Sequence, residues 1–133
     1  MMDKTPQLPF VESLISLFRK QEGVCFAFLF GSRARNQAGA NSDWDIAIWF
    51  KDNSDQFSNL GFREEIRSEI SRCLQVPVDQ VDIVDLYRAD LSISASVIEE
   101  GIPLLGDDTL EMARYYQRIW ALMEDNYSRT AVV

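Results

Sequence analysis

Two short, densely apolar segments, Val24–Phe30 and Asp43–Phe50, constrain the fold of this chain more than any other feature. Both are rich in large aliphatic and aromatic residues, and twelve mostly polar or small residues separate them. Runs of this length, bounded by Gly, Ser and Asn, are typical of strands that are buried on both faces of a sheet. The second run opens with Asp43-Trp44-Asp45, so two carboxylates enter a strand of the core.

Asp43 and Asp45 are therefore candidate metal ligands. Residues two apart on a strand project to the same side, and neither carboxylate is stable as an anion in an apolar interior without a cation beside it. The chain contains no His, and carboxylate oxygens are hard donors, so the pattern favours Mg²⁺ or Mn²⁺ over zinc. The alternative is that both are solvated acids at the start of a strand.

Gly31-Ser32, directly after the first apolar run, is a candidate phosphate-binding element. A Gly lets the backbone come close to a ligand, and the following Ser offers both an N–H and a hydroxyl group to phosphate oxygens. The sequence therefore places a phosphate-binding element and a metal-binding pair on either side of one loop.

Gly-Ser, ten residues and then Asp-Trp-Asp resembles the GSx10DxD signature of the DNA polymerase β-like nucleotidyltransferases. The flanking segments GSRARNQ and SDWDIAIWF are most similar to the minimal nucleotidyltransferase (MNT) branch, whose members are small antitoxins found beside HEPN-domain toxins. The resemblance covers roughly residues 11–105. It implies an α/β (α+β) fold of the polymerase β-like nucleotidyltransferase type, in which helices flank a small mixed sheet.

The resemblance also implies a third metal-binding acid in the segment Val81–Leu86. Asp82 and Asp85 lie on opposite faces of this expected strand, so at most one of them can join the first pair. The family pattern favours Asp82, because the third acid typically follows a hydrophobic residue at the start of such a strand. Asp85 is then expected at the rim.

The expected roles follow nucleotidyl transfer by a two-metal mechanism. Asp43 and Asp45 would bind both ions, Asp82 the ion on the acceptor side, and Gly31-Ser32 the β- and γ-phosphates. The remaining nucleotide-binding candidates are Arg33, Arg35 and Ser42. A guanidinium group matches phosphate geometry, but each arginine is equally well explained as a solvated loop residue.

The 133 residues are expected to form a single domain. Its core spans about residues 9–105, and a C-terminal helix covers about residues 108–128. Within the core we expect a helix from Pro9, an amphipathic helix from about Phe62 to Leu74, a short helix 92–100 and a strand 102–105 at the sheet edge.

The C-terminal helix carries a stripe of large apolar residues. Its members are Met112, Tyr116, Ile119, Trp120, Met123 and Tyr127. Such a stripe is more often domain core than partner surface, yet this helix lies beyond the sheet motif, so part of the stripe is also a candidate partner surface.

The composition narrows the partners and the compartment. A net charge of -8 disfavours non-specific attraction to nucleic-acid phosphates, so we expect no stable nucleic-acid binding by the chain alone. Cys25 and Cys73 lack CxxC spacing and are expected as small buried residues and reduced thiols. Neither a signal peptide nor a membrane span is indicated, which favours the cytoplasm.

The acceptor of the transferred nucleotide is not encoded in these motifs. The chain lacks a separate acceptor-binding lobe, so another molecule must present the acceptor. Resemblance to the MNT antitoxins implies transfer of AMP from ATP to a tyrosine of a HEPN ribonuclease toxin, within a hetero-oligomer. Two alternatives remain open: small-molecule nucleotidylation of the aminoglycoside type, and a non-catalytic antitoxin that masks its toxin by binding.

Overall fold

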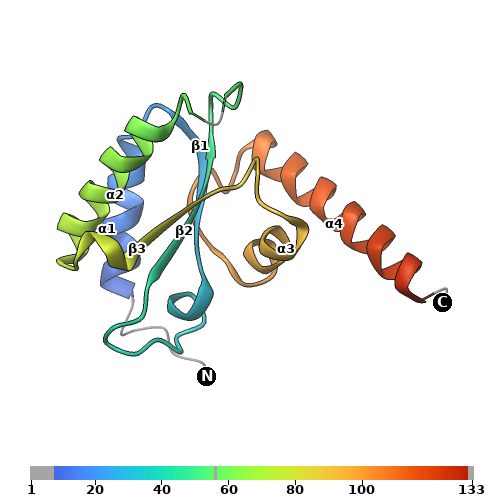
Figure 1. Ribbon diagram of the computed structural model, residues 1–133, viewed down its shortest axis with the longest axis horizontal. Coiled ribbons are helices and arrows are strands. Elements are labelled where there is room, and N and C mark those ends of the chain that lie inside the picture. The colour runs from blue at the N-terminus through green and yellow to red at the C-terminus, as the bar shows by residue number, and fades with distance from the viewer. Residues whose placement is uncertain (1–7, 56, 132–133) are drawn as a thin grey trace.

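The computed structural model describes residues 8–55 and 57–131, which form a four-stranded mixed sheet with helices on both faces (Figure 1). The strands are β1 (Val24–Phe30), β2 (Trp44–Phe50), β3 (Val81–Asp85) and β4 (Ile102–Leu105). Their order in the sheet is β3-β2-β1-β4. β1 is antiparallel to both of its neighbours, whereas β2 and β3 are parallel. The expected small mixed sheet is thus confirmed.

Two helices cover each face of the sheet. α1 (Leu8–Arg19) and α2 (Leu60–Leu74) lie on one side, and α3 (Leu91–Glu100) and α4 (Leu110–Ala131) lie on the other (Figure 1). Two short 3-10 turns, η2 (Gly31–Arg33) and η3 (Val78–Gln80), follow β1 and precede β3. We call the two sides the α1/α2 face and the α3/α4 face.

A continuous apolar core seals the α1/α2 face. It joins alternate residues of the central strands to the apolar stripes of the two helices, as the period of two along a strand requires. Its fully enclosed members include Leu14, Phe18, Ile46, Ile48, Phe50, Ile66 and Ile70. The helical spacings that predicted α1 and α2 are the spacings that fill this core.

The α3/α4 face has a smaller core, and α4 is only partly attached to it. Met112, Tyr115 and Ile119 are buried there, while Trp120 and Tyr127 are 47% and 76% exposed. Figure 1 shows the C-terminal half of α4 running away from the sheet. Trp120 and Tyr127 are therefore not core residues, which agrees with the alternative that part of the stripe is exposed, and the predicted stripe did not include the buried Tyr115.

Most element boundaries agree with the sequence expectations. β1 spans the first apolar run, whereas β2 begins at Trp44, which leaves Asp43 just before the strand. α2 ends at Leu74 and is capped by Gln75, whose left-handed φ of 57° closes the helix before Pro77. Pro103 lies on an edge strand, as its missing N–H requires.

The two cysteines are free thiols. Cys25 is half-buried, but Cys73 is exposed, so the expectation of a buried Cys73 was wrong. On α2 the side chains of Ile70 and Leu74 face the core. Cys73 precedes Leu74 by one residue, about 100° around the helix, and turns toward solvent.

Within the described ranges, no helix combines the length and the apolar character that a membrane crossing would need.

Candidate active site

Asp45 and Asp82 are direct neighbours in the parallel pairing of β2 with β3. Paired residues of adjacent strands project to the same side of a sheet, so these two carboxylates stand together. The residues alternating with them, Trp44, Ile46 and Ile83, belong to the core of the α1/α2 face. Asp45 and Asp82 therefore lie on the α3/α4 face, where Asp43 joins them from the loop just before β2.

The three acids lie close enough to act on one another electrostatically. Burial raises the pKa of Asp45 above its usual value, and the charges of Asp82 and Asp43 raise that pKa further. Arg35 acts in the opposite direction and lowers the pKa of Asp45. A half-buried carboxylate between two other carboxylates is a costly arrangement, because desolvation and like charge both disfavour its ionised form.

Gly31 brings the backbone against Asp45. Its φ of 76° lies in the left-handed region that glycine adopts without strain. A Cβ atom built on Gly31 would collide with Oδ2 of Asp45. Gly31 also accepts backbone hydrogen bonds from the N–H groups of Ala34 and Arg35 at 3.1 and 3.2 Å. Position 31 thus favours glycine both because of its positive φ and because a Cβ atom would collide with Asp45. The candidate phosphate-binding turn therefore lies directly beside the acids.

Ser32 is half-buried in the turn that follows Gly31. Its carbonyl oxygen accepts a hydrogen bond from the N–H of Gln37 at 2.9 Å. Asn36 closes the turn with a φ of 58°. Asn tolerates this left-handed conformation better than most residues.

The two arginines of the turn lie on different sides of the site. Arg33 donates from Nη2 to the carbonyl oxygen of Ser42 at 2.8 Å, and its guanidinium carbon lies 4.3 Å from the centre of the Trp44 ring. Trp44 belongs to the α1/α2 core, so Arg33 in this structure anchors the loop instead of facing the acids. Arg35 is exposed and acts electrostatically on Asp45.

Ser42 also stabilises the loop between β1 and β2. Its hydroxyl oxygen accepts a hydrogen bond from the N–H of Gly39 at 2.9 Å, and its own N–H donates to the carbonyl oxygen of Gly39 at 3.2 Å. The structure thus brings together Asp43, Asp45, Asp82, Gly31 and Arg35. It commits Arg33 and the Ser42 hydroxyl to contacts within the loop.

Asp85 lies away from these acids. It follows Asp82 by three residues on β3 and pairs with Ile48, which places it on the α1/α2 face. Oδ2 of Asp85 binds Nη1 of Arg88 at 3.0 Å, and Oδ1 accepts from the N–H of Tyr87 at 3.1 Å. Asp85 therefore has a structural partner, whereas Asp82 is exposed beside Asp45.

The donor set of the three acids fits a hard divalent cation. The carboxylates repel one another, and a cation between them would remove the penalty that raises the pKa of Asp45. Across residues 8–55 and 57–131, no three such side chains are already close enough to coordinate one ion. The donor chemistry of the three acids thus suits a hard cation, but in this structure their carboxylates do not form a coordination sphere.

Glu100 is a contributor that the sequence did not reveal. It lies at the end of α3, and its Oε1 contacts Nη1 of Arg35 at 3.3 Å. The two residues are 65 positions apart, so no local pattern connects them. This exposed ion pair positions Arg35 at the edge of the acid cluster.

Comparisons with known proteins agree with this geometry. A family model described as "Polymerase beta, Nucleotidyltransferase" matches residues 12–110. The chain is 28% identical over 126 residues to the protein adenylyltransferase MntA of Aphanizomenon flos-aquae (strain 2012/KM1/D3), which covers 90% of this chain and 82% of that protein.

Solved structures also match the chain. One is a chain from a crystal structure of a toxin–antitoxin with AMP-PNP, with a TM-score of 0.67 and 25% identity, covering 92% of this chain and 94% of that one. A chain from a complex of a tri-AMPylated Shewanella oneidensis HEPN toxin with its MNT antitoxin has the same fold, with a TM-score of 0.63 at 24% identity over 95% and 94% of the two chains. Because this family model matches residues 12–110, well over half of the chain, the chain belongs to the polymerase β nucleotidyltransferase family.

Proposed function

We propose that this protein is an antitoxin adenylyltransferase that transfers AMP from ATP to a tyrosine of a HEPN ribonuclease toxin. The observation that carries the proposal is the contact of Gly31 with Asp45, which itself pairs with Asp82. A glycine turn that closely approaches Asp45 thus lies beside the carboxylates of Asp45, Asp82 and Asp43, which act on one another electrostatically. Relatives described as an adenylyltransferase and as a toxin–antitoxin bound to AMP-PNP support both the reaction and the nucleotide.

The reaction replaces one phosphorus–oxygen bond with another. The acceptor hydroxyl oxygen attacks the α-phosphorus of ATP, the bond from that phosphorus to the α,β-bridging oxygen breaks, and pyrophosphate leaves. The acceptor proton passes to a nearby base, a role that we assign to the exposed Asp82. We assign the half-buried Asp45 and its neighbour Asp43 to the nucleotide side.

The three acids would hold Mg²⁺ or Mn²⁺. A bound divalent ion would neutralise charge on the leaving pyrophosphate and favour deprotonation of the acceptor. Asp43 and Asp45 are assigned to both ions and Asp82 to the acceptor-side ion. The choice of Mg²⁺ rests on the all-oxygen donor set and on the absence of His from the chain.

The triphosphate is assigned to the Gly31-Ser32 turn. The backbone N–H and the hydroxyl group of Ser32 are suited to the β- and γ-phosphates. Arg35 is the stronger of the two arginine candidates, since it already acts on the acid cluster. Arg33 would first have to leave Trp44 and the Ser42 carbonyl, so we give it a supporting role.

A protein acceptor is supported by the exposed surface of α4. Trp120, Leu122 and Tyr127 are large apolar side chains that the fold leaves exposed, and residues of this kind are enriched in protein interfaces. The acceptor tyrosine would arrive on the docked toxin. Negative phosphates added near the toxin's catalytic groups would then repel an RNA backbone.

The decisive experiment uses the purified chain with the HEPN-type product of the adjacent gene, ATP and Mg²⁺. Intact mass spectrometry should show one or more added AMP groups on the partner, and peptide mapping should place them on tyrosine. The Asp43→Asn variant is the matched control and should add none. An aminoglycoside offered in place of the partner should remain unmodified.

Two results would overturn the proposal. If the toxin is neutralised with no added mass, and the Asp43→Asn variant neutralises it equally well, the protein is a masking antitoxin. If an aminoglycoside receives AMP while the partner does not, the protein is a small-molecule nucleotidyltransferase.

A further inference from the structure

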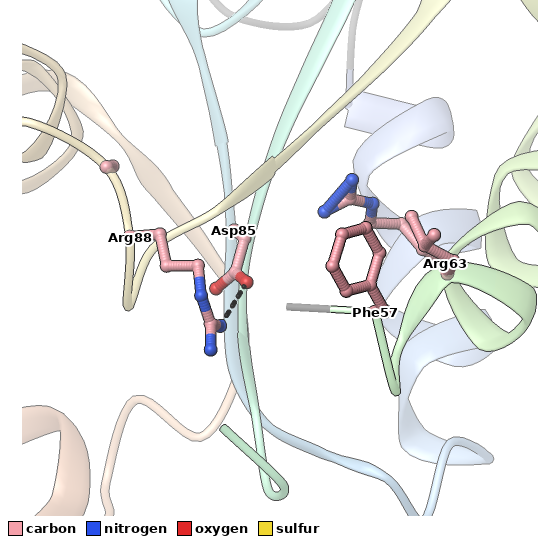
Figure 2. Close-up of a pocket in the computed structure, with 6 residues that line it drawn as sticks. Phe57, Arg63, Asp85 and Arg88 are labelled. Atoms are coloured by element: carbon pink, nitrogen blue, oxygen red, sulfur yellow. Dashed lines mark hydrogen bonds and ion pairs between the residues drawn. The ribbon is translucent and has the colours of Figure 1, made fainter. Parts of the chain in front are cut away.

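A polar cavity lies on the α1/α2 face, at the end of β3 that is farther from the acid cluster. Its volume is about 450 Å³, and it is lined by Phe57, Leu60, Arg63, Asp85, Arg88 and Ala89. Figure 2 shows Arg63 and Arg88 on opposite sides of this cavity, with Asp85 beside Arg88 and Phe57 beside Arg63. None of these residues belongs to the proposed active site.

The charges in this cavity do not cancel. Asp85 is paired with Arg88 at 3.0 Å, and Arg88 also donates to the carbonyl oxygen of Asn53 at 2.9 Å. Among the described residues no ion pair of Arg63 is found, and its buried Nε has no hydrogen-bond acceptor, as is also the case for Nε of Arg33 and Arg67. A buried donor without an acceptor is rare in folded proteins and indicates a missing partner. One uncompensated guanidinium group thus faces the cavity of a chain whose net charge is -8.

Other features of the cavity favour an anion. The lining residue Leu60 opens α2, whose N-terminus lacks a side-chain cap, so the positive end of the helix lies at the cavity. Phe57 is 66% exposed and Leu60 is 42% exposed, which leaves an apolar surface beside the charge. The cavity therefore combines the guanidinium group of Arg63 with the exposed apolar surface of Phe57 and Leu60, against which a flat or apolar group could pack.

We infer that this cavity is an oxyanion-binding site for a phosphate or carboxylate group. Arg63 supplies the main charge-assisted hydrogen bonds, and the outer edge of Arg88 adds to them. The apolar or aromatic part that carries the anion lies on Phe57 and Leu60. The carrier is either a free small molecule, such as a mononucleotide, or a phosphorylated side chain of a protein.

The inference is tested by phosphate binding to the whole protein at constant ionic strength. The Arg63→Gln variant should bind inorganic phosphate at least about tenfold more weakly, as expected for the loss of a charged hydrogen-bond donor. Arg72→Gln on the same helix is the matched control, and it should bind as wild type does. Phosphate bound at the Gly31-Ser32 turn adds the same component to the titration of every variant, so it is fitted as a separate site.

A second readout needs no variant. The Nε–Hε resonance of Arg63 should shift as phosphate is added to the wild-type protein. A free carrier predicts that AMP binds more tightly than phosphate and that this binding depends on Arg63. If the anion is instead carried by a protein, a phosphotyrosine peptide should bind more tightly than phosphate, and this binding should depend on Arg63. Unchanged phosphate affinity in Arg63→Gln together with a stationary Arg63 resonance would overturn the inference, whatever the outcome for AMP transfer.

Discussion

The two faces of the sheet differ in what their side chains accomplish. The α1/α2 face is closed by fully buried aliphatic and aromatic side chains from both helices and the central strands. The α3/α4 face carries three interacting carboxylates at one end and a helix that leaves the sheet at the other. The difference indicates that packing on the α1/α2 face supplies most of the stability. On the α3/α4 face, the repulsion and partial burial of the carboxylates are destabilising.

The largest expected effect concerns transfer and belongs to the α3/α4 face. Asp45→Asn should reduce the rate of AMP transfer by about a thousandfold, or about 4 kcal/mol of transition-state stabilisation. The fold should remain intact, because Asp45 contributes repulsion instead of packing. Single-turnover transfer and circular dichroism of the same sample measure both quantities. Transfer at the wild-type rate would remove Asp45 from the site.

The second effect concerns stability and belongs to the α1/α2 face. Ile48 is fully buried in that core, so Ile48→Ala should lower the free energy of unfolding by about 2–5 kcal/mol. Trp120→Ala, on the exposed part of α4, should change it by no more than about 0.5 kcal/mol. Urea denaturation compares the two variants. Equal losses would show that α4 is as firmly packed as the opposite face.

Substitution of Gly31 is expected to affect both the stability of the fold and AMP transfer. Gly31→Ala places a methyl group against Asp45 and forces a non-glycine residue into a φ of 76°. We expect a loss of about 1–3 kcal/mol in stability together with reduced transfer. Gly39→Ala is the control, since its Cβ would meet nothing nearer than Oγ of Ser42 at 4.0 Å. Similar behaviour of both variants in denaturation and transfer assays would contradict the proposed close approach.

The smallest expected effect is a pH dependence. Because the folded protein has a raised Asp45 pKa, the unfolded chain releases that proton first as the pH rises above the usual value of 3.8. The contribution of Asp45 to stability is therefore most favourable below that value and is lost as the pH rises through its folded pKa. Metal-free Asp45→Asn should lack this decline. Thermal melts of the wild type and of Asp45→Asn across the acidic pH range measure this decline. If the melting temperature depended on pH in the same way in both proteins, the raised pKa of Asp45 would be contradicted.

Much of the architecture could be predicted because local patterns determine it. The apolar run Val24–Phe30 gave both ends of β1, and Pro103 placed β4 at an edge. Gly31-Ser32 and the Asp-Trp-Asp segment indicated the site because their chemistry is unusual in a core strand. Asp82 was favoured over Asp85 by family pattern, and the pairing of Asp82 with Asp45 agrees with that choice.

Other features depend on long-range geometry that no local pattern contains. The side of the loop taken by Arg33 depends on how Trp44 packs below it. The burial of Tyr115 instead of Trp120 depends on where α4 leaves the sheet. The pairing of Arg35 with Glu100 joins distant segments. Sequence periodicity gives the face of a helix, but it does not show how far along its length that face is covered.

The most direct test of the account uses two acids on opposite faces of one strand. ATP labelled at the α-phosphate is supplied with the HEPN-type partner to the wild type, Asp82→Asn and Asp85→Asn, and a parallel reaction uses label at the γ-phosphate. We predict that the wild type and Asp85→Asn transfer the α-label to the partner, that Asp82→Asn does not, and that no variant transfers the γ-label. Transfer of the γ-label, or loss of transfer in Asp85→Asn but not in Asp82→Asn, would contradict AMP transfer from the α3/α4 face.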